Sequence, residues 1–159
     1  MIEILSGSFI GMVILDICKV PNSVLRAECS PLGSLTLSDR ELFKNMEYTM
    51  RESGGIGLAA PQVGVEKMMF VALDEKGKVF KVVNPVIVKS WGSDTMAEGC
   101  LSIPDETVEV RRNYRVIVEG VDENNKALKL KAEGLFARIL QHEIDHLKGR
   151  LITDYRRRA

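Results

Sequence analysis

The segment His142-Glu143-Ile144-Asp145-His146 constrains this chain more than any other, because its chemistry depends on a helix. Residues four apart lie on the same face of a helix, so both imidazole rings can grip one ion. Glu143 follows the first histidine and can act as a general base toward water at that ion. The alternative is a pair of ordinary helix histidines flanked by carboxylates. We expect a metal site on a helix.

A helix from about residue 133 to 147 is predicted around this motif, and Gly149 stands where a C-cap glycine is typical. Four residues at positions i, i+4, i+7 and i+11 share one face of it: Leu135, Ile139, His142 and His146. The same stripe would bury the helix. The two apolar members are therefore candidates for the core as well as for a binding pocket.

The rest of the chain predicts one more helix and several strands. The helix should begin at Ser38, which forms a Ser-x-x-Glu capping box with Glu41, and end at Gly54-Gly55. Strands with hairpin turns between them are expected over residues 68–73, 79–83, 86–88, 114–121 and 127–132. Strands joined by tight turns, with helices set apart in sequence, indicate an α+β fold. Its antiparallel sheets should pack around the C-terminal helix.

Length and charge limit the classes of protein to consider. The 159 residues are expected to form one catalytic domain, with residues 1–11 as a candidate N-terminal extension. Lysine plus arginine equal aspartate plus glutamate at 22 each, which leaves no electrostatic footprint for DNA or a membrane surface. The one basic run, Arg156 to Arg158, is expected to be a solvated tail, with a docking patch, such as for a ribosome, as the alternative.

The cysteines indicate a reducing compartment. There are three, an odd number, and they are widely spaced in a chain long enough to fold without disulfides. The apolar N-terminal stretch lacks the basic start and small-residue cleavage site of a signal peptide. We therefore expect a cytoplasmic protein of bacterial type.

A hydrolytic metal site needs a third protein ligand and an open position for water. The sequence contains only two histidines, and little of it follows His146, so we expect the third ligand upstream. Cys100 is the best candidate, because it lies in Glu98-Gly99-Cys100-Leu101-Ser102, where glycine permits tight geometry. Cys18 and Cys29 lack comparable surroundings and are expected to be small buried hydrophobic residues.

Three segments resemble the signature motifs of the peptide deformylases, in the order and at separations compatible with that family. They are Gly55-Ile56-Gly57-Leu58-Ala59-Ala60-Pro61-Gln62, Glu98-Gly99-Cys100-Leu101-Ser102 and Gln141-His142-Glu143-Ile144-Asp145-His146-Leu147-Lys148-Gly149. An early segment, residues 21–26, is also similar, with Asn22 where aspartate is more usual. The resemblance covers about residues 12–155. Asp105 departs from it, because many members have glycine there.

The resemblance implies an enzyme that removes the N-formyl group from the initiator formylmethionine of nascent polypeptides and releases formate. One divalent ion would be held by Cys100, His142 and His146, with Glu143 as the general base. Fe(II) is implied as the ion in the cell, and zinc, nickel or cobalt can occupy such a ligand set in purified protein. The Gln62 side-chain amide and the Leu101 backbone N–H would stabilise the oxyanion.

The peptide substrate is expected to pair strand-wise with bare backbone beside the metal, and its methionine side chain to enter an apolar pocket. The residues implied in substrate binding are Gly55, Ile56, Gly57, Glu98, Gly99, Leu135 and Ile139. Asp145 could orient a ligand histidine, but an exposed helix carboxylate is the favoured interpretation. Two rival functions remain open: a zinc endopeptidase of the His-Glu-x-x-His kind, and a non-catalytic module stabilised by its metal.

Overall fold

The computed structural model describes residues 11–156, so the predicted extension lies outside the described residues except for Gly11. The helices are α1 (Leu37–Glu52) and α2 (Gly134–Leu147), with short 3-10 helices η1 (Ser23–Arg26), η2 (Ala60–Val63) and η3 (Ile152–Tyr155). The strands are β1 (Gly57–Ala59), β2 (Met69–Leu73), β3 (Val79–Trp91), β4 (Asp94–Cys100), β5 (Ile103–Arg112), β6 (Arg115–Val121) and β7 (Ala127–Glu133). None of the helices in this part of the chain is long and apolar enough to cross a membrane.

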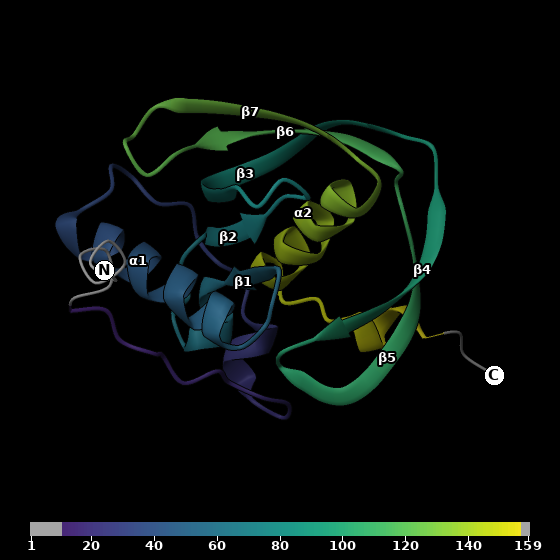
Figure 1. The fold of residues 1–159 in the computed structure, drawn as a ribbon, viewed down its shortest axis with the longest axis horizontal. Coiled ribbons are helices and arrows are strands. Elements are labelled where there is room, and N and C mark those ends of the chain that lie inside the picture. The colour runs from purple at the N-terminus through teal and green to yellow at the C-terminus, as the bar shows by residue number, and fades with distance from the viewer. Residues whose placement is uncertain (1–10, 157–159) are drawn as a thin grey trace, which may run out of the picture.

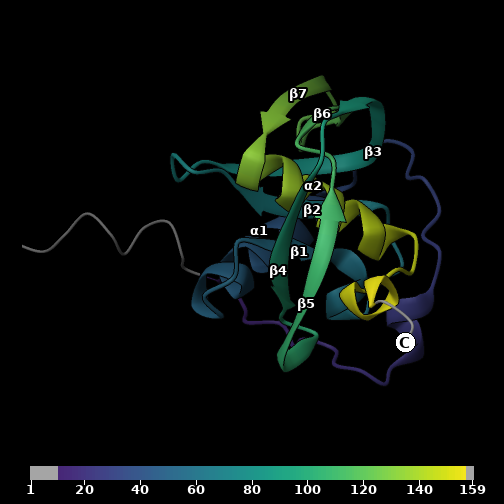
Figure 2. The same ribbon diagram turned by 90° about the vertical axis from the view of Figure 1, so that its right-hand side faces the viewer.

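The strands form two antiparallel sheets with α2 between them. One sheet has the order β1-β2-β3-β6-β7, and the other is the β4-β5 pair. In Figure 1, α2 runs beneath the five-stranded sheet, with α1 on one side and β4 and β5 on the other. Figure 2 shows β4 and β5 crossing in front of α2. The predicted α+β class, with antiparallel sheets around the helix that carries the histidines, is confirmed.

The largest buried cluster lies between the five-stranded sheet and α2. Phe70 and Val118 face Leu140 and Ile144 across this layer, and all four are almost completely buried. A second cluster packs α1 on β1 and β2, and a third joins β5 to η1 and η3. Burial of this kind contributes about 1.5–3 kcal/mol for each large apolar side chain. The helix with the candidate ligands is therefore held by the core on one side.

The predicted N-cap of α1, Ser38, was wrong by two residues. The N-cap is Thr36, whose side chain accepts a hydrogen bond from the Asp39 N–H, and Asp39 completes the capping box in return. Both Thr36 and Ser38 are good N-cap residues, so local propensity does not separate them. A distant contact favours Asp39: its Oδ1 atom accepts a hydrogen bond from Lys67 Nζ at 2.5 Å.

The predicted strand at 86–88 is part of β3, which continues through Pro85 by means of a β-bulge between residues 83 and 86. Asn84 adopts a φ of 51° there, and its side chain accepts from and donates to the backbone of Leu32. The sequence analysis also missed β4 and β5. On β5 the inward-facing series Val108, Val110 and Arg112 ends in a charge, which conceals the alternation of a half-buried strand.

Candidate metal centre

Two helix positions and one strand end bring three ligand atoms together. The Nε2 atoms of His142 and His146 lie 3.2 Å apart on one face of α2, and Cys100 Sγ lies 3.4 Å from His146 Nε2. All three atoms lie within 4.8 Å of one another. His146 is 1% exposed, and burial lowers its pKa, so its neutral imidazole can offer a lone pair. The predicted set of Cys100, His142 and His146 therefore converges.

Cys100 owes its orientation to a break in the β4-β5 ladder. Glu98 pairs with Val108, but Cys100 pairs with Ile103, and the register shifts between them. Such bulges commonly redirect side chains beside functional sites, because the extra residue bends the strand. Here the extra residues lie on β5, soon after the turn from β4, and the ladder breaks beside Cys100. Cys100 is thereby directed toward the two histidines of α2.

Glu98 fixes the orientation of His142. Its Oε2 atom lies 2.9 Å from His142 Nδ1, which leaves Nε2 to face the site. Burial alone would raise the pKa of Glu98, but hydrogen bonds from Arg112 and His142 lower it to about 2. Burial opposes the charge of His142, yet its contacts with Cys100 and Glu98 raise its pKa to about 10. An ion at His142 Nε2 would therefore displace a proton.

Both carboxylate oxygens of Glu98 are occupied within the protein. Arg112 donates to them from Nε at 2.8 Å and from Nη2 at 2.9 Å, and Arg138 Nη1 donates to Oε1 at 2.8 Å. The sequence analysis placed Glu98 among the substrate-binding residues. Glu98 lines the groove, and its carboxylate contacts His142 Nδ1, as carboxylates around metal sites often do for a histidine. The analysis missed Arg112 and Arg138, because an arginine on a strand or helix carries no sequence signal for such a role.

Glu143 lies beside the ligands with one oxygen unpartnered. Its side chain is 3% exposed, and the Oε2 atom is buried without a hydrogen-bond partner. Burial raises the pKa of Glu143 to about 7, although the positive charges of His142 and Arg112 oppose that rise. A carboxyl group with a pKa near neutrality can both accept and donate a proton. Glu143 is therefore suited to general acid–base chemistry.

Gln62 presents its amide nitrogen to the site. The Ala59 N–H donates to Gln62 Oε1 at 3.0 Å, which orients the amide so that Nε2 faces Ser102 Oγ at 3.1 Å and Cys100 Sγ at 3.6 Å. Gln62 is 2% exposed and belongs to η2. Leu101 lies across from Gly55, where an added Cβ atom would come within 2.8 Å of Leu101 Cδ1. The predicted catalytic residues thus lie at one site.

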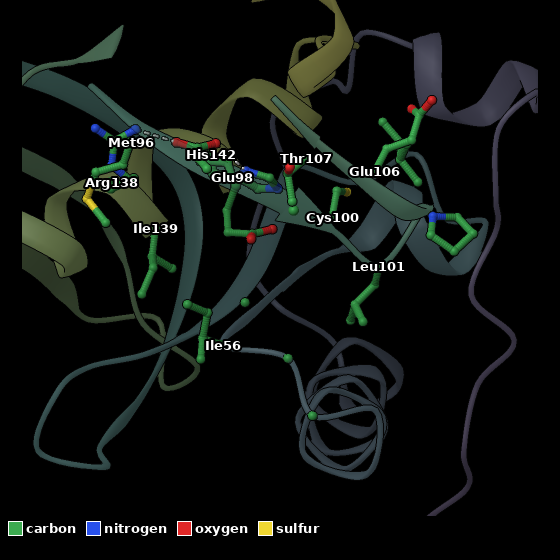
Figure 3. A pocket seen from close by; sticks show the side chains of 18 of the residues that line it. Ile56, Met96, Glu98, Cys100, Leu101, Glu106, Thr107, Arg138, Ile139 and His142 are labelled. Carbon is green, nitrogen blue, oxygen red and sulfur yellow. Dashed lines mark hydrogen bonds and ion pairs between the residues drawn. The ribbon is translucent and has the colours of Figure 1, made fainter. Parts of the chain in front are cut away.

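A groove of about 690 Å³ opens over these groups (Figure 3). It is lined by every predicted site residue except His146, which lies beneath it: Gly55, Ile56, Gly57, Gln62, Glu98, Gly99, Cys100, Leu101, Leu135, Ile139, His142 and Glu143. Ile56 and Leu135 are roughly half exposed, whereas Ile139 is buried in the main core and also borders the groove. Asp105 lies at its rim with a φ of 63°, a conformation that favours glycine.

Asp145 is not the exposed helix carboxylate that was expected. Its Oδ2 atom accepts hydrogen bonds from Arg112 Nη1 at 2.6 Å and from the Tyr155 hydroxyl at 2.5 Å. Its side chain is 13% exposed. Asp145 does not contact a ligand histidine directly, because Arg112 and Glu98 lie between them. The sequence analysis missed Tyr155 altogether.

The residues present fit a divalent metal ion. A thiolate and two imidazole nitrogens suit zinc, Fe(II), Ni(II) or Co(II), and the carboxylate behind His142 sets the ring orientation. Three protein ligands leave one coordination position for water or substrate. The unpartnered Glu143 carboxylate beside a substrate-sized groove adds the base that hydrolysis requires. An α+β fold with such a site defines a metallohydrolase.

The family model described as polypeptide deformylase matches residues 14–159, and the chain belongs to this family. It is 42% identical over 144 residues to the peptide deformylase of Halothermothrix orenii, across 90% of this chain and 94% of that protein. The Ehrlichia chaffeensis peptide deformylase in complex with actinonin superposes with a TM-score of 0.89 at 35% identity, covering 92% of this chain and 90% of that one. The class I type b peptide deformylase of Acinetobacter baumannii, bound to Met-Ala-Ser, superposes with a TM-score of 0.85 at 30% sequence identity. The match covers 90% of this chain and 98% of that one.

The predicted family is therefore confirmed, and with it the enzyme class. The chain is a metal-dependent hydrolase of the peptide deformylase family. Family membership decides against the two rivals, an endopeptidase and a non-catalytic module.

Proposed function

We propose that this enzyme removes the formyl group from the N-terminal formylmethionine of new polypeptides and releases formate, using the predicted site residues. The observation that carries the proposal is the convergence of Cys100, His142 and His146 beside the unpartnered carboxylate of Glu143. A groove with an apolar end leads to this point. The Met-Ala-Ser peptide bound to the Acinetobacter baumannii relative supports a peptide as the occupant of the groove.

Glu143 moves the proton. A divalent ion held by the three ligands would act as a Lewis acid and lower the pKa of a water molecule toward neutrality. The Glu143 carboxylate accepts a proton from the attacking water while the water oxygen bonds to the formyl carbon. It then donates that proton to the amine nitrogen as the carbon–nitrogen bond breaks. A pKa raised to about 7 by burial suits both steps.

Gln62 and Leu101 stabilise the negative charge that develops on the formyl oxygen. The Gln62 amide is fixed at its oxygen by the Ala59 N–H, so Nε2 is oriented before substrate arrives. The Leu101 backbone N–H, in the turn after Cys100, is the second donor. Donors held in place in advance lower the barrier because they need no reorganisation during the reaction.

The groove accounts for recognition of the first residue. Gly55, Gly57 and Gly99 offer backbone without side-chain bulk, against which an extended peptide can lie. Ile56, Leu135 and Ile139 form the apolar end that receives the methionine side chain. Two of these residues, Ile56 and Ile139, are labelled in Figure 3. Glu98 contributes through His142 rather than by touching substrate.

We propose Fe(II) as the ion in the cell, with zinc, nickel or cobalt able to replace it. All three cysteines are free, which supports a reducing compartment, and the similar enzymes named above come from bacteria. We infer a cytoplasmic enzyme that folds as one catalytic domain and acts on nascent chains near the ribosome.

The test is formate release from formyl-Met-Ala-Ser by protein purified without oxygen, with metal analysis of the same sample. We expect about one divalent ion for each chain and a loss of at least about a hundredfold in turnover for Glu143→Ala with the ion retained. An unformylated peptide should remain uncut. If Glu143→Ala kept both its metal and its activity, the proposed mechanism would be wrong.

A further inference from the structure

The hydrogen bond from His142 to Glu98 sets which nitrogen of the ring faces the ligand cluster. The ring offers Nδ1 to Glu98 Oε2 at 2.9 Å and turns Nε2 toward His146 and Cys100. A proton on Nδ1 leaves the lone pair on Nε2, and the position of Glu98 therefore determines both tautomer and ring angle. Whatever holds Glu98 in place also holds this ligand in place.

Glu98 is held by two arginines that are themselves anchored in different ways. The Arg138 guanidinium donates to the backbone carbonyls of Val110 and Asp94 at 2.8 Å each, so the main chain fixes it. Arg112 has no such backbone partner in the part of the chain that the structure describes. Beyond Glu98, it donates only to two side chains, Asp145 and Tyr155.

Tyr155 makes three interactions with the side chains of Arg112 and Asp145. Its hydroxyl donates to Asp145 Oδ2 at 2.5 Å and accepts from Arg112 Nη1 at 3.2 Å. The Arg112 guanidinium carbon also lies 4.9 Å from the centre of the Tyr155 ring. The side chains of Arg112 and Asp145 are only 4% and 13% exposed, and buried ions of this kind need every available hydrogen bond.

The segment that carries Tyr155 is firmly attached to the protein. Ile152, in the same 3-10 helix, is 2% exposed and packs in the third core cluster with Leu25 and Val110. Asp154 pairs with Arg26 at 2.7 Å. Figure 2 shows this segment, in yellow, lying beside β5, the strand that ends with Arg112. The Tyr155 hydroxyl is therefore placed by packing and does not depend on the polar contacts alone.

We propose that Tyr155 is a positioning residue for the metal centre. Its hydroxyl holds Asp145 and Arg112 in the arrangement that keeps Glu98 on His142 Nδ1. This inference rests on the proposed function, because it takes His142 as a metal ligand. A role in stability alone would predict a different outcome, in which loss of the hydroxyl lowers the free energy of unfolding and leaves His142 unchanged.

The first experiment compares two variants of the same 3-10 helix. Tyr155→Phe removes only the hydroxyl, whereas Ile152→Val removes one buried methylene group and leaves the hydrogen bonds. Each change should lower the stability of the protein by a similar small amount. In zinc-loaded protein mixed with excess chelator, Tyr155→Phe should lose zinc about three- to tenfold faster than wild type. This is less than the roughly 10–100-fold effect of removing a direct partner of a ligand, because Tyr155 acts through Asp145 and Arg112. Ile152→Val should match wild type.

A second readout is independent of metal affinity. The chain has only two histidines, so the imidazole signals of ¹⁵N-histidine-labelled protein can be assigned directly. In zinc-loaded wild type we expect a slowly exchanging His142 Nδ1 proton, because Glu98 accepts it. In Tyr155→Phe that proton should exchange faster, and in Ile152→Val it should not. Should Tyr155→Phe fail to fold, Asp145→Asn, which weakens the same contact, should give the same two changes.

The proposal is overturned if Tyr155→Phe retains zinc as long as Ile152→Val does and shows the same His142 signal. Failure of the proposed function would look different. In that case wild type would bind no stoichiometric zinc or would release no formate from formyl-Met-Ala-Ser.

Discussion

The backbone of Gly57 lies so close to the Glu143 carboxylate that a Cβ atom on residue 57 would overlap Glu143 Oε1. Gly57 opens β1, and Glu143 lies on α2, 86 positions later in the chain. The contact leaves the carboxylate little room on the side of Oε1, and its other oxygen, Oε2, is buried without a hydrogen-bond partner. The close contact with Glu143 is therefore what requires glycine at position 57. The φ of Gly57 is not one that favours glycine.

Gly57→Ala should consequently displace Glu143. We expect turnover of formyl-Met-Ala-Ser to fall by about a hundredfold, because a shift of about 1 Å at a catalytic group costs that much. The free energy of unfolding should fall by about 1–3 kcal/mol, as for other overpacked sites. Gly33→Ala is the matched control, since an added Cβ there meets no atom within 4 Å. Equal activity in the two variants would contradict the close contact.

Glu98→Gln should damage both the fold and the metal site. The change removes the one negative charge that Arg112 and Arg138 share and leaves Asp145 as the buried carboxylate on Arg112, which should lower the free energy of unfolding by about 3–5 kcal/mol. Zinc affinity should drop about 10–100-fold, because His142 loses its support. Urea unfolding and chelator competition measure the two effects. Glu119→Gln, which breaks only an exposed pair with Lys129, should change stability by about 0.5 kcal/mol or less.

Gln62→Leu should reduce turnover by about a hundredfold or more, because it removes one oxyanion donor. Ser102→Ala provides the comparison, since it removes the other partner of Gln62 Nε2 and keeps the amide. We expect the turnover of Ser102→Ala to fall by less than about tenfold, because only one supporting hydrogen bond is lost. Steady-state kinetics of formate release separate these outcomes. Near-normal turnover in Gln62→Leu would exclude the oxyanion role.

Asp39→Asn should make stability less dependent on pH. Burial opposes ionisation of Asp39, but hydrogen bonds from Lys67 and Thr36 outweigh it and lower the pKa of this carboxyl below its ordinary value. A lowered pKa in the folded state contributes stability above the unfolded-state pKa of about 4, and that stability is lost as pH falls through the folded pKa. Urea unfolding should therefore show a large difference between wild type and Asp39→Asn at pH 7 and a small one near pH 3.

Glu41→Gln is the control for this experiment. Glu41 was the predicted capping partner of Ser38, but it is exposed and takes no part in the capping box that the structure contains. Its replacement should change stability by about 0.5 kcal/mol or less at either pH. A larger loss for Glu41→Gln than for Asp39→Asn would restore the original assignment.

Local sequence determined the parts of this protein that depend on neighbours within one helical turn or one hairpin. The spacing of His142 and His146 places both rings on one face of α2, and turns at 74–77 and 122–125 join the strands as predicted. Periodicity reports these contacts because the backbone itself sets the distance between the residues. The three motifs also indicated the family, and through it more than half of the residues that line the groove.

Only the tertiary structure decided how these parts are supported. Cys100 and His146 are in contact although 46 positions separate them in the sequence. The separation is 33 positions for Arg112 and Asp145, and 28 for Lys67 and Asp39. No local pattern encodes such a contact, because it depends on how sheets and helices pack after they form. Asp145 looked like an exposed helix carboxylate for this reason. Its neighbours Arg112 and Tyr155 reach it from a strand and from a 3-10 helix, and burial then requires the three groups to satisfy one another.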